Sequence, residues 1–326
     1  MSQKCRNLKQ FMLHISYVGT QYQGISKSSK RAVISVIEEQ LLKLLPENKP
    51  FGLKTSSRTD QGVHAFFNTV RFLTNSHYSF NSKDLRYYMN YNLSRASEMI
   101  RIHQVKEIPL DMNIISNVFR RTYLYRIGLI SNSNFLWNCA TAWESQQIKF
   151  VGAPFNFELF LETAKCLSGT YNYCGFTNLE GMLNAKDPVK NLNITVTESA
   201  PSVLNMHSHP VLSSNFPVKY IDVFVTAESF MNKMVRNLVG SMIDVAIGNC
   251  RLEDVSDVVN RGHYYLNEKP FICAPPYALY LYNIEYKNEH LNFDVNKWQD
   301  ESRYNITDFE PKIEVPIIPK DEKLEI

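Results

Sequence analysis

Hydrophobic and polar residues follow two different periods along the first part of the chain. Residues 11–17 place apolar side chains at every second position, which is typical of a half-buried strand. Residues 30–45 place theirs on one helical face, and Pro46 ends this segment. The same two periods predict strands at 51–57, 66–73 and 99–105 and a helix that opens at Ser82. The predicted order is strand, helix, two strands, helix, strand.

A second round of elements begins near residue 121. Residues 121–130 are predicted as a strand and residues 156–167 as a helix that stops at Gly169. Two strands then flank a loop at about 200–216. The later predicted elements are helices over 230–247 and 252–260 and a last strand over 278–286. The side chains expected to face the core are Phe157, Phe160, Leu161, Ala164 and Leu167 in the helix at 156–167, and Met231, Met234, Val235, Leu238, Met242 and Ile243 in the helix at 230–247.

The repeated order predicts an α+β fold of two similar halves, with helices on one side of mainly antiparallel sheets. A chain of 326 residues has the length of about two domains. We expect an N-terminal α+β domain over 1–110, a C-terminal α+β domain over 111–286 and a tail over 287–326. The tail holds 6 basic and 10 acidic side chains and three prolines, which is typical of an extended or disordered segment.

The charge of the chain is unevenly distributed. Of 35 basic and 32 acidic side chains, 29 and 22 lie in residues 1–286, so this body is basic and the tail is acidic. A modestly basic body is compatible with a polyanionic partner, but many proteins without such a partner carry a similar charge. Charge alone therefore leaves nucleic-acid binding open.

Composition excludes several classes of protein. With 44% hydrophobic and 21% charged residues, the chain is neither disordered nor collagen-like, and no apolar run approaches the ~18 residues that span a bilayer. The first strand starts near residue 11, which leaves no room for a secretory signal peptide. Six scattered cysteines with no Cys-x-x-Cys pair favour reduced thiols over a zinc site or a disulfide framework. We expect a cytoplasmic protein; the alternative is a mitochondrial one, because the first ten residues contain Lys4, Arg6 and Lys9 and no acid.

One loop concentrates titratable side chains. The string Ser57-Arg-Thr-Asp-Gln-Gly-Val-His-Ala65 lies between two predicted strands and brings together Arg58, Asp60 and His64, while Gly62 permits a tight turn. For an arbitrary Arg-Thr-Asp triplet, the simplest interpretation is a solvated hairpin in which the aspartate caps a turn.

The full string resembles the Gly-Arg-Thr-Asp-Ala-Gly-Val-His-Ala signature of the tRNA pseudouridine synthase family that acts on the anticodon arm. Other family landmarks follow in order, so the resemblance covers nearly all of residues 11–286. Within the family, the chain most resembles the divergent eukaryotic synthase-like branch. The further landmarks are Tyr17–Gly24, Asn90–Leu93, Arg121–Tyr125, Gly169–Phe176, Pro188–Lys190, Phe230–Asn237 and Ala274–Leu279.

The resemblance implies a fold and a chemistry. The fold is two similar ferredoxin-like α/β-sandwich halves with a central active-site cleft, and the reaction isomerises uridine to pseudouridine in tRNA with no metal or organic cofactor. The expected partner is tRNA, at anticodon-arm positions of about 38–40, recognised by shape and phosphates. Other RNAs stay open as substrates, as do the monomeric and homodimeric states.

The resemblance also assigns roles to three residues. Asp60 is the nucleophile or base, Arg236 pairs with its carboxylate, and Tyr123 stacks on the target uracil. We also expect Arg58 to contact an RNA phosphate or to flip out the base. These roles are chemically reasonable, because breaking the C1′–N1 bond requires a carboxylate beside the sugar, and a nearby guanidinium favours the ionised form. An extruded base is usually held on aromatic faces.

Each assignment has a structural alternative. Arg58 could brace the loop, and a strand tyrosine such as Tyr123 is more often part of a core. A buried arginine such as Arg236 needs a carboxylate, for which Asp60 is our choice. We expect His64 to orient the loop rather than move protons, and we do not interpret His207-Ser-His209 as a metal site.

Several positions depart from the family pattern. The usual glycine before Arg-Thr-Asp is Ser57, and a phosphate-facing arginine is replaced by Asn113; the other departures are Ile25-Ser26, Lys190 and Ala278. They bear on substrate choice more than on chemistry. Two competing functions remain: an RNA-binding or chaperone protein that has lost catalysis, and a glycosidase, which would need a second carboxylate beside Asp60.

Overall fold

The computed structural model describes residues 8–27, 31–45, 50–75, 81–130, 144–152, 154–183, 187–199, 218–262 and 271–293. Its strands are β1 (Leu8–Tyr17), β2 (Phe51–Thr55), β3 (His64–Asn75), β4 (Ile100–Ile108), β5 (Val118–Ile130), β6 (Lys149–Gly152), β7 (Gly169–Asn172), β8 (Val189–Ser199), β9 (Val218–Ala227) and β10 (Leu279–Tyr286). Its helices are α1 (Val33–Leu44), α2 (Ser82–Arg95), α3 (Phe157–Leu167), α4 (Leu179–Leu183), α5 (Met234–Ala246) and α6 (Leu252–Arg261).

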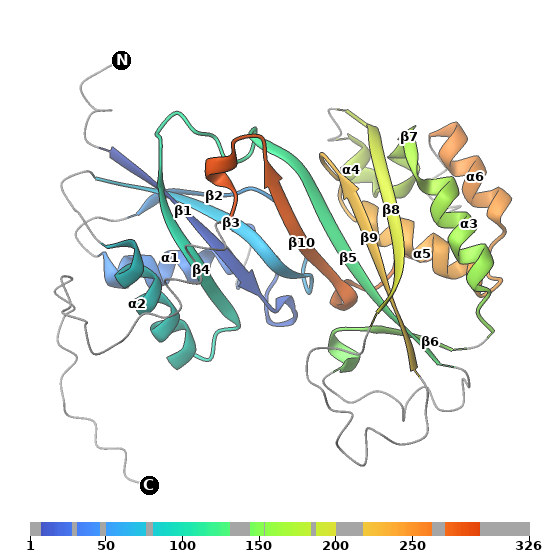
Figure 1. The fold of residues 1–326 in the computed structure, drawn as a ribbon, viewed down its shortest axis with the longest axis horizontal. Coiled ribbons are helices and arrows are strands. Elements are labelled where there is room, and N and C mark those ends of the chain that lie inside the picture. The colour runs from blue at the N-terminus through green and yellow to red at the C-terminus, as the bar shows by residue number, and fades with distance from the viewer. Residues whose placement is uncertain are drawn as a thin grey trace, which may run out of the picture.

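The strands form one long sheet in the order β4-β1-β3-β10-β5-β9-β8-β7, with β2 added to β3 and β6 to β5 (Figure 1). Most pairs are antiparallel; β10 with β3 and β5 with β6 are parallel. Helices α1 and α2 lie beside β1–β4, whereas α3–α6 lie beside β7–β9 (Figure 1). The fold is therefore α+β with a large, mostly antiparallel sheet, as the periodicity predicted.

Strand β10 joins segments that are far apart in the sequence. It is the last strand of the chain, yet it lies between β3 and β5 and pairs with both (Figure 1). Its Leu281 is the partner of Ala65 on one side and of Tyr123 on the other. The strand that follows the Asp60 loop and the strand that carries Tyr123 are thus both neighbours of β10.

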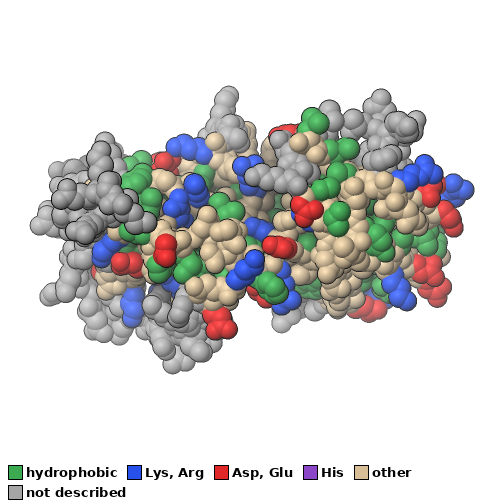
Figure 2. All heavy atoms as spheres, turned by 90° about the horizontal axis from the view of Figure 1, so that it is seen from above, with side chains coloured by type: hydrophobic (Ala, Val, Ile, Leu, Met, Phe, Trp, Pro, Cys, Tyr) green, Lys and Arg blue, Asp and Glu red, His purple; other side chains and the backbone are tan. Residues whose placement is uncertain are grey.

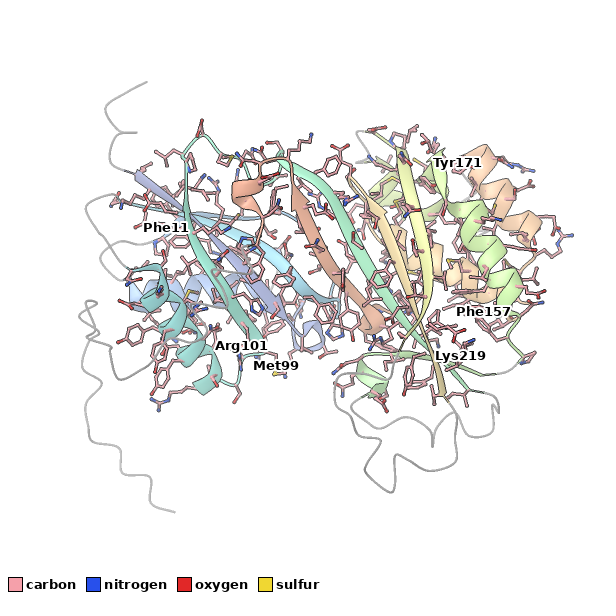
Figure 3. The ribbon with its side chains drawn as sticks, in the orientation of Figure 1. Phe11, Met99, Arg101, Phe157, Tyr171 and Lys219 are labelled. Carbon is pink, nitrogen blue, oxygen red and sulfur yellow. The ribbon has the colours of Figure 1, made fainter. Side chains whose placement is uncertain are left out.

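Side-chain contacts occur toward both ends of the sheet. Phe11 on β1 and Tyr171 on β7 lie toward the two ends of the sheet, and side chains fill the space between strands and helices (Figure 3). Phe11 stacks on Phe72 of β3 with ring centroids 5.4 Å apart. At the other end, the Lys219 ammonium of β9 lies 4.9 Å from the ring centroid of Phe157, the first residue of α3 (Figure 3).

Helix α5 is buried almost all round. Twelve of its thirteen residues are buried, and the exception is Arg236 in the first turn. Each large apolar side chain buried in this way contributes about 2 kcal/mol. The helix is thus fixed by its apolar residues, and it carries one cation toward a partly exposed position.

The observed helix and strand ends correct the sequence prediction in places. The helix expected to start at Phe230 begins at Met234, because Lys233 has a left-handed backbone (φ 58°) that ends the preceding loop. Leu161, predicted to face the core, is 41% exposed, so the contact face of α3 is narrower than its apolar stripe. The elements β6, β7 and α4 were not predicted, since four or five residues are too few to establish a period.

Some predictions fall on residues outside the described ranges. They include the loop at 200–216 with His207-Ser-His209 and residues 294–326 of the tail. Within the described ranges, no helix has both the length and the apolar composition that crossing a bilayer requires.

Candidate active site

The loop that carries Asp60 is held by hydrogen bonds from polar side chains of the neighbouring strands. The Ser57 carbonyl accepts hydrogen bonds from Asn68 Nδ2 and from Thr55 Oγ1, each 3.0 Å long. The Thr59 hydroxyl bonds the Tyr17 hydroxyl at 2.7 Å. These contacts hold the chain on either side of Arg58, so the loop leaves β2 in a defined direction.

Two glycines let the backbone turn and pack closely here. Gly62 has a φ of +79°, which confirms the predicted tight turn. Gly24 has a φ of +85°, and a Cβ atom at this position would lie 2.6 Å from the Thr59 carbonyl oxygen. That same oxygen accepts a hydrogen bond from Ile25 N at 3.3 Å. The string Tyr17–Gly24 therefore forms a backbone support for the Asp60 loop, a role that sequence reasoning did not assign to it.

His64 connects this loop to the rest of the sheet. Its Nδ1 accepts a hydrogen bond from Gly19 N at 3.1 Å, and its Nε2 donates to the Tyr277 carbonyl at 2.8 Å. Burial lowers the pKa of the imidazole, so the neutral form with its proton on Nε2 satisfies both contacts. Both nitrogens are occupied by backbone groups, which confirms the expectation that His64 orients the loop.

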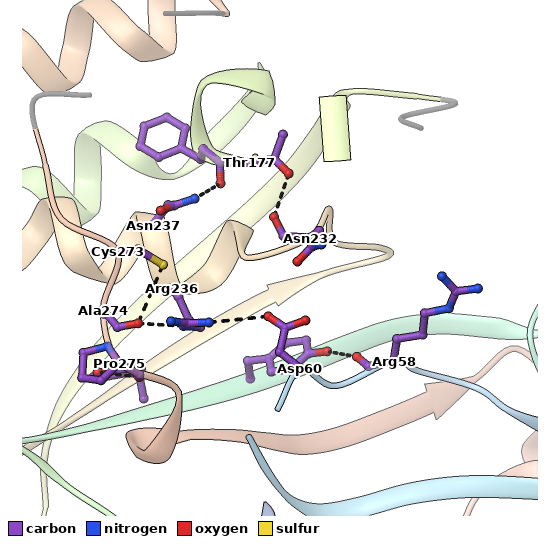
Figure 4. A network of polar contacts seen from close by, with 12 residues as sticks. Arg58, Asp60, Thr177, Asn232, Arg236, Asn237, Cys273, Ala274 and Pro275 are labelled. Carbon is purple, nitrogen blue, oxygen red and sulfur yellow. Dashed lines mark hydrogen bonds and ion pairs between the residues drawn. The ribbon is translucent and has the colours of Figure 1, made fainter. Parts of the chain in front are cut away.

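Asp60 faces the guanidinium of Arg236. Arg236 Nη1 lies 3.7 Å from Asp60 Oδ2, while Nε donates to the Ala274 carbonyl at 2.7 Å (Figure 4). The Arg236 side chain is 14% exposed and that of Asp60 is 38% exposed. Ala274 N in turn donates to the Arg236 carbonyl at 3.0 Å. The predicted pair is present, and the segment around Ala274 orients its cation.

Tyr123 closes the other side of the loop. Its hydroxyl lies 3.2 Å from Ser57 Oγ and donates to the Arg58 carbonyl at 3.3 Å. Its ring meets Phe230 edge to face, with centroids 5.1 Å apart. Burial raises the pKa of Tyr123, which keeps the phenol neutral. Phe230 was not among the predicted site residues; its position depends on the loop before α5.

Ser57 is accommodated where the family has glycine. Among the described residues other than glycine, only Ser97 and Lys233 have a positive φ, so Ser57 causes no backbone strain of this kind. The side chain is buried, and its hydroxyl reaches the Tyr123 hydroxyl.

All four predicted residues line one cleft of about 700 Å³. Asp60, Arg236 and Tyr123 lie in its wall, and Arg58 is exposed, with its guanidinium directed away from the Asp60–Arg236 pair (Figure 4). The charged residues that line the cleft are Arg58, Arg121, Lys190, Lys233 and Arg236 together with Asp60, Glu180, Asp187 and Glu228. A glycosidase would need a second carboxylate beside Asp60, and the cleft contains three more acidic residues.

Arg121 is a cleft residue to which the sequence assigned no role. Its Nη2 donates to the Ser56 carbonyl at 2.7 Å, and its Nη1 donates to the Glu228 carbonyl. Desolvation lowers its pKa, yet an arginine stays charged. The side chain thereby connects the Asp60 loop to the segment that leads into Phe230. The period of two along β5 places it on the same face as Tyr123, and this signal could have identified it.

The described residues contain no group of three His, Cys, Asp or Glu side chains arranged to hold a metal ion. Four cysteines lie in the described ranges, at Cys166, Cys174, Cys250 and Cys273, and all are free thiols.

Comparison with known proteins finds similarity to one kind of enzyme. A family model described as tRNA pseudouridine synthase matches residues 171–287, a range that includes Arg236. The tRNA pseudouridine synthase A of a Hydrogenobaculum species is 27% identical over 256 residues, which cover 77% of this chain and 90% of the relative. That of Dictyoglomus turgidum is 26% identical over 84% of this chain and 98% of the relative.

A eukaryotic relative is similar to the same extent. The tRNA pseudouridine synthase-like 1 of Xenopus laevis is 24% identical over 86% of this chain and 93% of its own. The chain is thus similar to tRNA pseudouridine synthases of bacteria and of a eukaryote over most of its length. Since bacterial and eukaryotic relatives are about equally similar, the expected placement nearer the eukaryotic branch stays a prediction.

Proposed function

We propose that this protein is an isomerase that converts uridine to pseudouridine in tRNA, first of all in the anticodon arm. The observation that carries the proposal is the Asp60–Arg236 pair beside Tyr123 in a cleft of about 700 Å³. It combines a partly exposed carboxylate, a fixed cation and an aromatic ring. Similarity to tRNA pseudouridine synthases supports the same reaction.

In this reaction Asp60 acts at the ribose of the target uridine. The carboxylate attacks C1′ or removes a ribose proton, the C1′–N1 bond breaks, and the uracil turns and rejoins through C5. N1 gains a proton and C5 loses one, so the change is an isomerisation without a cofactor. Arg236 holds a positive charge next to the carboxylate throughout, 3.7 Å away, and offsets negative charge at this position while the bond breaks.

Tyr123 and Arg58 act on the base and the RNA strand. The uridine must leave its stack to reach Asp60, and the Tyr123 ring, braced by Phe230, offers an aromatic surface for it. Arg58 is exposed and has no ion-pair partner among the described residues, so its guanidinium is available to a phosphate or to the space that the flipped base leaves.

We also propose the finer architecture that the resemblance implies. Two ferredoxin-like halves, 1–110 and 111–286, meet at the cleft, and 287–326 forms an acidic tail. The support is the sheet order, in which β10 connects the strands of the first part to β5. We further propose a cytoplasmic location, with mitochondria as the alternative, and a monomer or homodimer that binds tRNA.

Tritium release from tRNA transcripts labelled at uracil C5 tests the function. Wild type should release tritium and form pseudouridine, Asp60→Asn should do neither, and Glu107→Gln should behave as wild type. Glu107 is a suitable control because it is a carboxylate paired with Lys9 on the far strands β1 and β4.

The other outcomes separate the competing functions. Free uracil without pseudouridine would favour a glycosidase that uses an acid of the cleft such as Glu228. If the protein binds RNA but releases no tritium from a broad pool of transcripts, the result would favour an RNA-binding or chaperone protein that has lost catalysis. Equal release by wild type and Asp60→Asn would remove Asp60 from the mechanism.

A further inference from the structure

A second hollow lies next to the cleft, on the strand that leads into the Asp60 loop. It has a volume of about 260 Å³ and is lined by Lys54 of β2, Arg71 of β3 and residues 110–115 of the β4–β5 connection. Ser56, two residues after Lys54, already lines the cleft. Two residues of extended chain, as from Lys54 to Ser56, span at most ~7 Å. Six residues, as from Lys54 to Asp60, span at most ~20 Å, so the Cα atoms of Lys54 and Asp60 lie within ~20 Å of each other.

The two cations of this hollow lie side by side on neighbouring strands. Lys54 and Arg71 are directly opposed partners of the β2–β3 ladder, which puts both side chains on the same face. Their Cβ atoms are then ~5 Å apart, and like charges in this position destabilise a sheet. Within the described part of the chain, neither cation has a carboxylate oxygen within ion-pair distance. An anion between them would relieve the repulsion.

Arg71 is held in place for such a contact. Its Nη1 donates to Gln10 Oε1 at 2.8 Å. Gln10 Nε2 in turn donates to the carbonyls of Pro109 and Met112, at 2.7 and 2.8 Å. The guanidinium is therefore fixed against the turn that forms the wall of the hollow, while Lys54 is exposed at its edge.

The neighbouring Asn113 shapes the turn beside the two cations. Its Oδ1 accepts hydrogen bonds from Ile115 N at 2.9 Å and Ser116 N at 3.4 Å. Asp111 also lines the hollow and opposes an anion there. The hollow thus contains two cations and one acid, a net positive charge.

We propose that Lys54 and Arg71 bind a backbone phosphate of the substrate RNA, a few nucleotides from the uridine in the cleft. An arginine fork and a lysine point charge are the side chains that hold phosphates, and phosphate contacts fix the register of the nucleic acid. Figure 2 shows Lys and Arg side chains spread along one face of the molecule, from its left to its right end, with acidic side chains among them. This inference rests on the proposed function and adds a contact that positions the RNA.

The test measures tRNA binding by the full chain at several salt concentrations. With an in vitro transcribed tRNA, Lys54→Gln should weaken binding about fivefold at low salt. It should also reduce the slope of log K against log salt by about 1. Asp111→Asn should strengthen binding by a similar factor. Lys165→Gln removes the same charge from an exposed position on α3 and should leave tRNA binding unchanged.

The two proposals fail separately in this design. If wild type forms pseudouridine and both Lys54→Gln and Asp111→Asn bind tRNA within twofold of wild type, with equal salt slopes, the phosphate site is wrong and the function stands. If the predicted shifts in binding occur but wild type forms no pseudouridine, the site stands and the function is wrong. Lys54 is chosen for substitution because it is exposed, whereas Arg71 also supports Gln10.

Discussion

Replacing Arg236 by alanine removes the cation that faces Asp60. Unit charges 3.7 Å apart interact by about 1.1 kcal/mol at the dielectric constant of water and by about 4.5 kcal/mol at an effective value of 20. The Asp60 side chain is 38% exposed and that of Arg236 is 14% exposed, so an intermediate value of about 2 to 3 kcal/mol is reasonable. If this attraction acts fully only in the transition state, when bound RNA excludes water from the cleft, its loss should lower the rate about 30- to 150-fold.

The assay for this prediction is pseudouridine formation under single-turnover conditions with saturating enzyme. Arg236→Lys keeps the charge but loses the Nε contact to Ala274, and it should recover part of the rate. Arg126→Ala is the matched control, because Arg126 makes a shorter ion pair with Asp222, at 2.8 Å, and does not line the cleft. That variant should lose thermal stability and keep its rate.

A folded Arg236→Ala enzyme within threefold of the wild-type rate would refute the reasoning. Equal slowing by Arg126→Ala would also refute it, because the effect would then come from general destabilisation and not from the charge beside Asp60.

Three further changes test other parts of the structure. Gly24→Ala should destabilise the protein by about 3 kcal/mol, from a left-handed φ that costs about 1–2 kcal/mol and from a clash with Thr59. Gly248 has a similar φ, but a Cβ atom there would meet nothing within 4 Å, so Gly248→Ala should lose only the about 1–2 kcal/mol that the left-handed φ costs. Urea unfolding measures both losses, and equal losses would contradict a clash between residue 24 and Thr59. Tyr123→Phe loses two long hydrogen bonds and should stay within about fivefold of the wild-type rate, whereas Tyr123→Leu should lose about 5- to 150-fold; equal losses would argue against stacking. Burial lowers the pKa of His14 to about 3, so its neutral form stabilises the fold above pH 6.5, and this stability is lost as the pH falls. From pH 7 to pH 5 the loss should be about 2 kcal/mol, and in His14→Gln the difference in unfolding free energy between these pH values should shrink by that amount; an unchanged difference would contradict the cause.

Local patterns predicted most of the secondary structure. The alternation at residues 11–17 and the apolar face at 30–45 correspond to β1 and α1, because burial of one face imposes its period directly on the sequence. The Asp60 loop was found in the same way, from a dense group of titratable side chains beside a glycine. The family resemblance then connected it to Tyr123 and Arg236, which are 63 and 176 residues further along the chain.

Local patterns are silent on pairing between distant segments. The position of β10 between β3 and β5 depends on hydrogen bonds among strands more than 100 residues apart, and no period within one strand encodes its neighbours. The same reason explains Phe230, whose place beside Tyr123 follows from the left-handed turn at Lys233.

The sequence by itself determined which residues we propose for the chemistry, since Asp60, Tyr123, Arg236 and Arg58 stand in motifs that can be found one at a time. The tertiary structure alone decided how they meet: a carboxylate 3.7 Å from a guanidinium, a serine hydroxyl on the tyrosine, and Arg121 between the two walls of the cleft. It also placed Lys54 opposite Arg71. Contacts of this kind depend on the distance between groups in space, and a linear pattern contains that distance only where neighbours in the chain are also neighbours in the fold.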